Sequence, residues 1–109
     1  DSGLEYDALN GMPGPYVKWF LNNIGNIGLV KLLDGYENKR AKAVCNIAYY
    51  DGEKVQIFKG IVNGTIVSPT GTSTFGWDNI FKPDGSNQTY GEMSPQLKNS
   101  LSHRRKALN

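Results

Sequence analysis

The dipeptide Asp51-Gly52, set between two runs of strand-forming residues, constrains the fold of this chain more than any other feature. Asp-Gly is a preferred pair for tight hairpin turns, because the central residues of such turns need positive φ. Residues 41–50 are rich in small and β-branched side chains, and residues 54–62 continue in strand-forming character after the turn. The sequence therefore predicts two paired antiparallel strands.

A helix is predicted before the hairpin, because four apolar side chains recur at helical spacing within residues 17–24. Pro15 suits the first position of this helix, where its missing amide hydrogen costs nothing. Gly25 ends the helix, and Asn26 can cap a second short helix over residues 27–33.

After the hairpin the sequence predicts turns, a loop and a short helix. Asn63-Gly64 predicts a sharp turn or a bulge, and residues 68–73 have the composition of a loop. Ser94 is placed to cap a helix with Pro95 at its first position. These elements together predict an α/β domain with an antiparallel hairpin and helices at both ends.

Length and composition limit the classes of protein to which the chain can belong. At 109 residues it forms one domain at most, and its net charge of +2 gives no argument for binding a nucleic acid polymer or a membrane. No apolar run approaches the roughly 20 residues of a membrane span, so a soluble protein is expected. Cys45 has no second cysteine to pair with, which suits a reducing compartment.

The segment from Phe75 to Asp78 has the residue types of a pocket for a flat, oxygen-rich, anionic ligand such as a nucleotide. Phe75 and Trp77 flank Gly76, which lets a planar ring approach the backbone closely. Stacking of a base on such a ring contributes roughly 1–3 kcal/mol. The alternative is that both rings are core residues, but Asp78 beside them needs a polar partner in either case.

A basic cluster follows on a later element. Lys98, His103 and Arg104 can donate hydrogen bonds to phosphate or carbonyl oxygens, and the guanidinium presents a fixed fork of donors. No acidic residue follows Glu92, so an anionic ligand is favoured near this end of the chain. The alternative is a solvated basic face of a helix.

Two further candidates lie near the start of the chain. Asp1, with Glu5 and Asp7, has carboxylates for a metal site, although Glu5 and Asp7 are equally consistent with the solvated side of a strand. Lys18 lies beside the apolar stripe of the first helix. Solvent exposure and contact with a ligand are both open for it.

Five motifs in unbroken order make the chain resemble the inosine triphosphate pyrophosphatase family, whose members are also called Ham1-like. They are DSGL at 1–4, GMPGPY at 11–16, FGWDNIF at 75–81, YGEM at 90–93 and KNSLSHR at 98–104. The resemblance covers the whole chain and is closest to the eukaryotic branch. It implies an α/β fold built on a long, mixed, twisted sheet with flanking helices.

The resemblance also implies an activity. Members of the family are cytosolic homodimers that use magnesium to hydrolyse inosine, deoxyinosine and xanthosine triphosphates to the monophosphate and pyrophosphate, which cleanses the nucleotide pool. Asp1 matches the aspartate implicated in magnesium binding and activation of water. The residues that match substrate contacts are Ser2, Lys18, Phe75, Gly76, Trp77, Asp78, Lys98, His103 and Arg104.

The chain departs from the family pattern in one respect. The family cradles the triphosphate with a Ser/Thr-x-Asn-x-x-Lys loop, and in this chain no Ser or Thr is followed two positions later by Asn. Residues 1–109 are therefore expected to be the C-terminal part of a single pyrophosphatase domain, inactive alone. Two other hypotheses stay open, a nucleotide- or RNA-binding module without catalysis and a truncated relative that acts only through its dimer surface.

Overall fold

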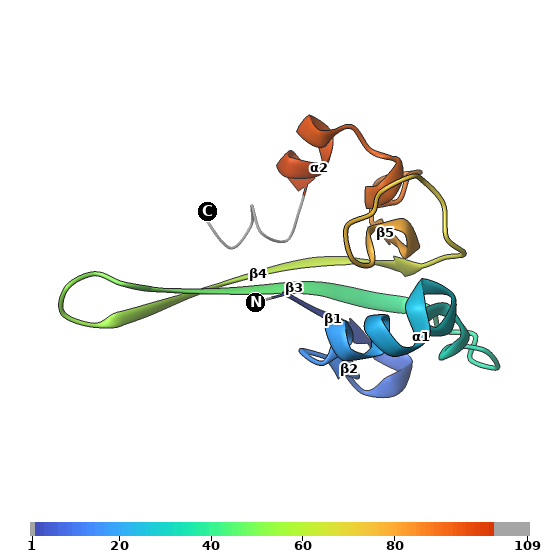
Figure 1. The fold of residues 1–109 in the computed structure, drawn as a ribbon, viewed down its shortest axis with the longest axis horizontal. Coiled ribbons are helices and arrows are strands. Elements are labelled where there is room, and N and C mark those ends of the chain that lie inside the picture. The colour runs from blue at the N-terminus through green and yellow to red at the C-terminus, as the bar shows by residue number, and fades with distance from the viewer. Residues whose placement is uncertain (1, 102–109) are drawn as a thin grey trace.

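The computed structural model describes residues 2–101, and its centre is a five-stranded sheet with the order β2-β1-β3-β4-β5 (Figure 1). Every pair of neighbouring strands in this described sheet is antiparallel. The strands are β1 (Ser2–Tyr6), β2 (Pro13–Gly14), β3 (Arg40–Tyr50), β4 (Val55–Ile66) and β5 (Phe81–Pro83).

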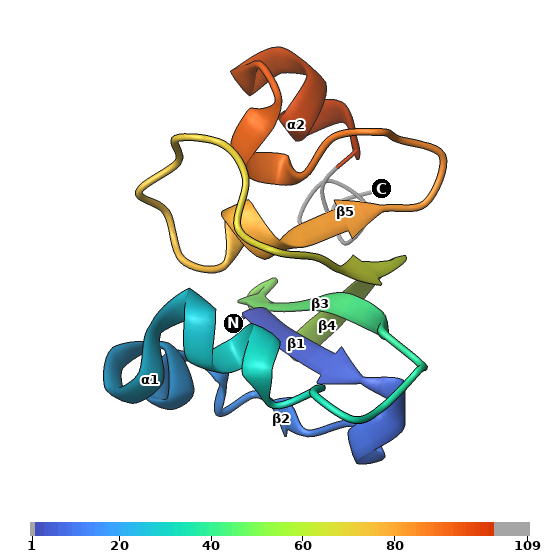
Figure 2. The ribbon, with the colours of Figure 1, turned by 90° about the vertical axis from the view of Figure 1, so that its right-hand side faces the viewer.

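The helices gather near the two edges of the sheet. Figure 2 shows α1 beside β1 and β2, with α2 on the far side of β5. Within residues 2–101 no helix has the length and hydropathy needed to cross a membrane. The helices are α1 (Val17–Lys31) and α2 (Pro95–Leu101), with the 3₁₀ turns η1 (Asp7–Leu9), η2 (Asp78–Ile80) and η3 (Tyr90–Glu92).

The predicted hairpin is confirmed, with Tyr50 opposite Val55 at its end. The Asp51 carboxylate accepts hydrogen bonds from the backbone N–H groups of Glu53 and Lys54, at 3.1 and 3.0 Å. The Asp51 N–H in turn donates to the Lys54 carbonyl. A short polar side chain that satisfies turn amides in this way is the reason that aspartate favours such turns.

The predicted turn at Asn63-Gly64 is wrong, because β4 continues through it to Ile66 without a break in register. Gly64 serves the approach of β5 instead. A Cβ there would lie 2.5 Å from the Lys82 carbonyl oxygen and 2.6 Å from the Phe81 ring. The glycine is therefore required by packing.

The predicted break in the first helix is confirmed, since Gly25 has φ 67° and ψ −178° inside α1. Two details differ from the prediction. The helix begins at Val17, so Pro15 lies in the turn before it. Asn26 does not cap the second part, because its Oδ1 accepts no hydrogen bond from the backbone; its Nδ2 donates to the Gly76 carbonyl instead. In α2 the predicted cap is confirmed: the Leu97 N–H donates to Ser94 Oγ at 3.2 Å.

The core lies at one end of the β3–β4 pair, where both edges of the sheet meet the helices. Tyr6 is fully buried there, and its hydroxyl donates to the Leu29 carbonyl at 2.9 Å. In the apolar stripe of α1, Val17 is buried but Ile24 is exposed. The largest fully buried side chains are Tyr6, Tyr90, Phe81, Leu4, Leu29, Leu33, Ile80 and Thr89.

Candidate functional site

A cleft of about 680 Å³ lies between α1 and the segment of residues 75–77, over β3. Its lining brings together predicted site residues from β1, α1 and the segment before η2, namely Ser2, Lys18, Phe75, Gly76 and Trp77. These positions are far apart in sequence, so their meeting is a result of the fold. The cleft is wide enough for a drug-sized or nucleotide-sized ligand.

The two aromatic rings of this wall have different environments. Trp77 is 7% exposed and packs edge-on against Phe81, with ring centroids 5.6 Å apart, and beside Tyr90. Phe75 is 55% exposed. Trp77 is therefore mainly a core residue, whereas the Phe75 ring is accessible to a planar ligand.

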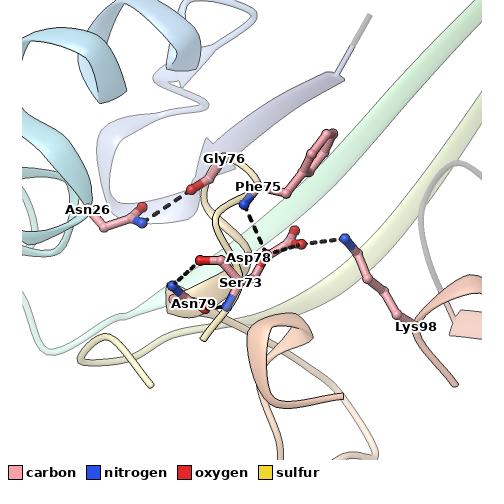
Figure 3. Close-up of polar contacts among 7 residues, drawn as sticks. All are labelled: Asn26, Ser73, Phe75, Gly76, Asp78, Asn79 and Lys98. Atoms are coloured by element: carbon pink, nitrogen blue, oxygen red, sulfur yellow. Dashed lines mark hydrogen bonds and ion pairs between the residues drawn. The ribbon is translucent and has the colours of Figure 1, made fainter. Parts of the chain in front are cut away.

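Asp78 has the polar partner that its position demanded. Its side chain is buried, and its carboxylate forms an ion pair with Lys98 of α2 and accepts a hydrogen bond from Ser73 Oγ at 3.2 Å (Figure 3). The Lys98 ammonium also lies 4.9 Å from the centre of the Phe75 ring, within the range of a cation–π contact. Asp78, Lys98 and Phe75 thus form one connected group.

A second hollow, of about 340 Å³, lies on the other side of this group. Asp78 and Lys98 line it together with Ser73 and Tyr90. The ion pair therefore lines the second hollow, where hydrogen-bonding groups of a ligand can reach it.

The segment of residues 73–79 is held in a fixed shape by its own polar groups. Asn79 accepts a hydrogen bond from the Ser73 N–H and donates to the Ser73 carbonyl, and Ser73 Oγ accepts from the Phe75 N–H at 3.0 Å. Gly76 has φ 54°, a conformation that favours glycine, and its carbonyl accepts a hydrogen bond from the Asn26 side chain (Figure 3).

The chain is similar to known proteins over its whole length. A model of the Ham1 family matches residues 1–109. The chain belongs to the Ham1 family. It is 53% identical over 110 residues to an inosine triphosphate pyrophosphatase of Candida albicans (strain SC5314 / ATCC MYA-2876), with 99% of this chain and 54% of that protein covered. It is 48% identical to the same-named protein of Scheffersomyces stipitis, covering 99% of the chain and 57% of that protein.

Solved Ham1 structures confirm the predicted fold class. The Staphylococcus aureus Ham1 protein matches with a TM-score of 0.86 and 36% identity, covering all of this chain and 60% of that one. A nucleoside-triphosphatase, dITP/XTP pyrophosphatase, of Mycobacterium abscessus matches with a TM-score of 0.80 and 33% identity, covering 99% of this chain and 62% of that one. The chain spans about half the length of the curated relatives it matches.

Three predicted site residues of this Ham1 chain, Asp1, His103 and Arg104, lie outside the described residues. Within residues 2–101 no three His, Cys, Asp or Glu side chains come together as a metal site. Asp7 is a candidate metal ligand with Asp1 in the sequence, and its carboxylate lies 3.9 Å from Lys42 Nζ. The described part therefore offers binding groups for an organic anion but no complete ligand set for magnesium.

Two residues of the site, Cys45 and Asn26, were not predicted from the sequence. Cys45 is buried in β3 and forms part of the floor of the cleft, although the sequence indicates only an apolar strand there. Asn26 contacts the aromatic segment from behind, across 50 positions of sequence. In the sequence Asn26 follows the predicted helix break at Gly25, and this position predicts a helix N-cap and not a contact with the cleft.

Proposed function

We propose that this chain carries the purine-binding part of an enzyme that hydrolyses inosine, deoxyinosine and xanthosine triphosphates to the monophosphate and pyrophosphate. The observation that carries the proposal is the cleft that brings Lys18 to the exposed ring of Phe75. Membership of the Ham1 family and the printed names of the relatives from Candida albicans and Mycobacterium abscessus support it.

In this proposal the base stacks on Phe75, and the Asp78–Lys98 pair presents polar groups beside it. His103 and Arg104 supply donors for the 6-keto oxygen of the purine. A donor aimed at a keto oxygen leaves an amino group unpaired, and sites that depend on such a bond reject the wrong analogue by roughly 10⁴-fold. Selectivity for keto purines over adenine follows.

The phosphates extend from the base toward Ser2 and Lys18, on the wall formed by β1 and α1. Water attacks the α-phosphorus, the bond from that phosphorus to the bridging oxygen breaks, and pyrophosphate leaves. Asp1 would contribute to holding magnesium. Within residues 2–101 no three His, Cys, Asp or Glu side chains come together as a metal site, so these residues bind the substrate.

We also propose that the protein acts in the cytoplasm as a homodimer. The distal part of the β3–β4 hairpin supports self-association, because it exposes a series of large apolar side chains, which is typical of interaction surfaces. They are Tyr49, Tyr50, Val55, Ile57, Phe58 and Ile61.

A second candidate is a nucleotide-binding protein without catalysis. The observation that favours it is that the cleft is lined by groups that can bind an organic anion, whereas within residues 2–101 no three His, Cys, Asp or Glu side chains come together as a metal site. Such a protein would bind inosine triphosphate without turnover.

Pyrophosphate release separates the candidates. We would measure it with inosine triphosphate and adenosine triphosphate, using this chain and the chain extended through its natural N-terminus. The extended chain should prefer inosine triphosphate in kcat/KM by about 10⁴-fold. The 109-residue chain should lose at least about 10²–10³ in rate, the typical cost of one preorganised donor. Equal rates on both nucleotides would contradict the base assignment, and equal turnover by the two chains would contradict the division of roles.

A further inference from the structure

Asn26 connects α1 to the aromatic wall of the cleft. It directly follows the break at Gly25, and its Nδ2 donates to the Gly76 carbonyl at 3.2 Å (Figure 3). Phe75 and Trp77 are the immediate neighbours of that glycine. One side chain of α1 therefore holds the Gly76–Trp77 peptide group, in the backbone between the two aromatic residues.

The unpaired end of the same amide indicates that this bond matters. Within the described part of the chain, Asn26 Oδ1 is buried and has no hydrogen-bond partner. A buried polar atom without a partner destabilises the fold, and a small apolar residue would avoid that cost. The observed contact that an asparagine provides here, and an alanine cannot, is the donation to Gly76.

Phe75 has a particular need for such support. Its ring is 55% exposed, and the Lys98 ammonium lies 4.9 Å from the ring centre. The backbone of residues 73–79 also orients it. Ser73 Oγ accepts a hydrogen bond from the Phe75 N–H on one side, and Asn26 donates one to the Gly76 carbonyl on the other. A stacking surface is effective only when its orientation is set before the ligand arrives.

We propose that Asn26 is a positioning residue for the base-binding wall: through the Gly76 carbonyl it sets the direction of Phe75 and the separation of that ring from Lys18. The inference rests on the proposed function, since it assigns Asn26 to binding of the purine. It predicts that loss of the amide donor weakens base-dependent affinity and leaves the affinity for phosphates alone unchanged.

The test uses Asn26→Ala, Asn26→Asp and Asn26→Gln in the chain extended through its natural N-terminus. Asn23→Ala is the matched control, because Asn23 lies on the same helix and its Nδ2 donates to the Trp19 carbonyl, within the helix itself. The readouts are KM and kcat for inosine triphosphate, the inhibition constant of inorganic tripolyphosphate, and the thermal midpoint.

Asn26→Ala should raise KM for inosine triphosphate by about 2–10-fold, the range that one hydrogen bond accounts for. Asn26→Asp should raise it further, because a carboxylate would face the Gly76 carbonyl without a donor. Asn26→Gln keeps the amide and should recover part of the loss. In all three, kcat and tripolyphosphate inhibition should stay within about twofold of wild type, as in Asn23→Ala.

Three outcomes overturn the inference. If the wild-type protein neither binds nor hydrolyses inosine triphosphate, the proposed function fails and this inference fails with it. If the wild type is active and the Asn26 variants match Asn23→Ala, the proposed function stands and Asn26 has no positioning role. If the Asn26 variants weaken tripolyphosphate as much as the nucleotide, or fail to fold while Asn23→Ala folds, the role of Asn26 is structural.

Discussion

The two ends of the β3–β4 hairpin have the same backbone structure and different surroundings. Near Arg40 and Ile66 the strands are covered by β1, β5 and the helices, and most of their residues there are buried or half-buried. Of residues 46–59, all of which the structure describes, none is buried. Figure 1 shows this distal part as an arm that extends away from the other elements.

Different interactions hold the two ends. The arm depends on local interactions, namely the turn at Asp51 and the stacking of Tyr49 on Phe58, with ring centroids 5.4 Å apart. The packed end depends on contacts between distant segments. All of the described candidate site residues lie at the packed end, where the fold can hold them rigidly.

The largest expected difference between the two ends is the cost of losing an aromatic ring. Trp77→Ala should lower the free energy of unfolding by about 3–5 kcal/mol, because it leaves a cavity beside Phe81 and Tyr90. Phe58→Ala in the arm should cost about 1 kcal/mol, since it removes one exposed cross-strand pair. Urea denaturation measures both. Equal costs would mean that the arm is as tightly packed as the core.

Within the packed end, Phe75 differs from Trp77 because its ring is exposed. Phe75→Ala should weaken inosine and xanthosine nucleotides alike by roughly 1–3 kcal/mol, because stacking does not distinguish between bases. The free energy of unfolding should change by less than about 0.5 kcal/mol, since the ring is exposed. Isothermal titration and denaturation separate the two effects. A variant that unfolds with its remaining affinity unchanged would assign Phe75 to the core.

A matched pair of tyrosines tests burial directly. Tyr6 and Tyr50 each donate a hydrogen bond of 2.9 Å to a backbone carbonyl, but Tyr6 is buried and Tyr50 is in the exposed arm. Tyr6→Phe should cost about 1–2 kcal/mol, because it leaves the buried Leu29 carbonyl without that donor. Tyr50→Phe should cost less than about 0.5 kcal/mol. Denaturant midpoints compare them, and similar losses would contradict the role given to burial.

The smallest expected effect is on the stability of the folded state at low pH. Hydrogen bonds from the Thr89 N–H and the Thr70 hydroxyl hold the pKa of the Glu92 carboxyl below its ordinary value near 4.5. Glu92 therefore stabilises the folded state above about pH 4.5, and this contribution is lost as the pH falls through the lowered pKa. Glu92→Gln should reduce stability at pH 7 and flatten its decline in acid.

The control for that prediction is Asp51→Asn in the arm, where hydrogen bonds from the Lys54 and Glu53 N–H groups lower the pKa of the Asp51 carboxyl in the same direction. Because the arm contributes little to global stability, Asp51→Asn should change the thermal midpoint less at each pH. The midpoints at pH 7 and pH 3 measure this. A larger change for Asp51→Asn would reverse the ranking of the two ends.

Sequence reasoning succeeded where one or a few neighbouring residues determine the conformation. Asp51-Gly52 specifies a turn, Gly25 breaks a helix, and Ser94 caps one. It failed at Gly64 and Asn26, whose local signals favour a turn and a cap. At both positions a segment distant in sequence, β5 or the loop before η2, replaces the local preference with a tertiary contact.

The candidate site, too, could be predicted from the sequence only in part. The motifs predicted which residue types form it, and the family resemblance named its ligand. The pairing of Asp78 with Lys98 and the different exposure of Phe75 and Trp77 depend on how η2 meets α2 and β5. Two aromatic residues of one short segment have similar local preferences, so only packing can separate their roles.

The hairpin, the helix break at Gly25, the cap at Ser94 and the membership of a family follow from the sequence alone, because each depends on backbone preferences or on motifs read in order. The tertiary structure alone decided which end of the hairpin is covered, which ring faces the cleft, and that Asn26 reaches Gly76. These are contacts between segments many positions apart. Their free energy depends on the shape of both partners, and no local pattern in either one encodes it.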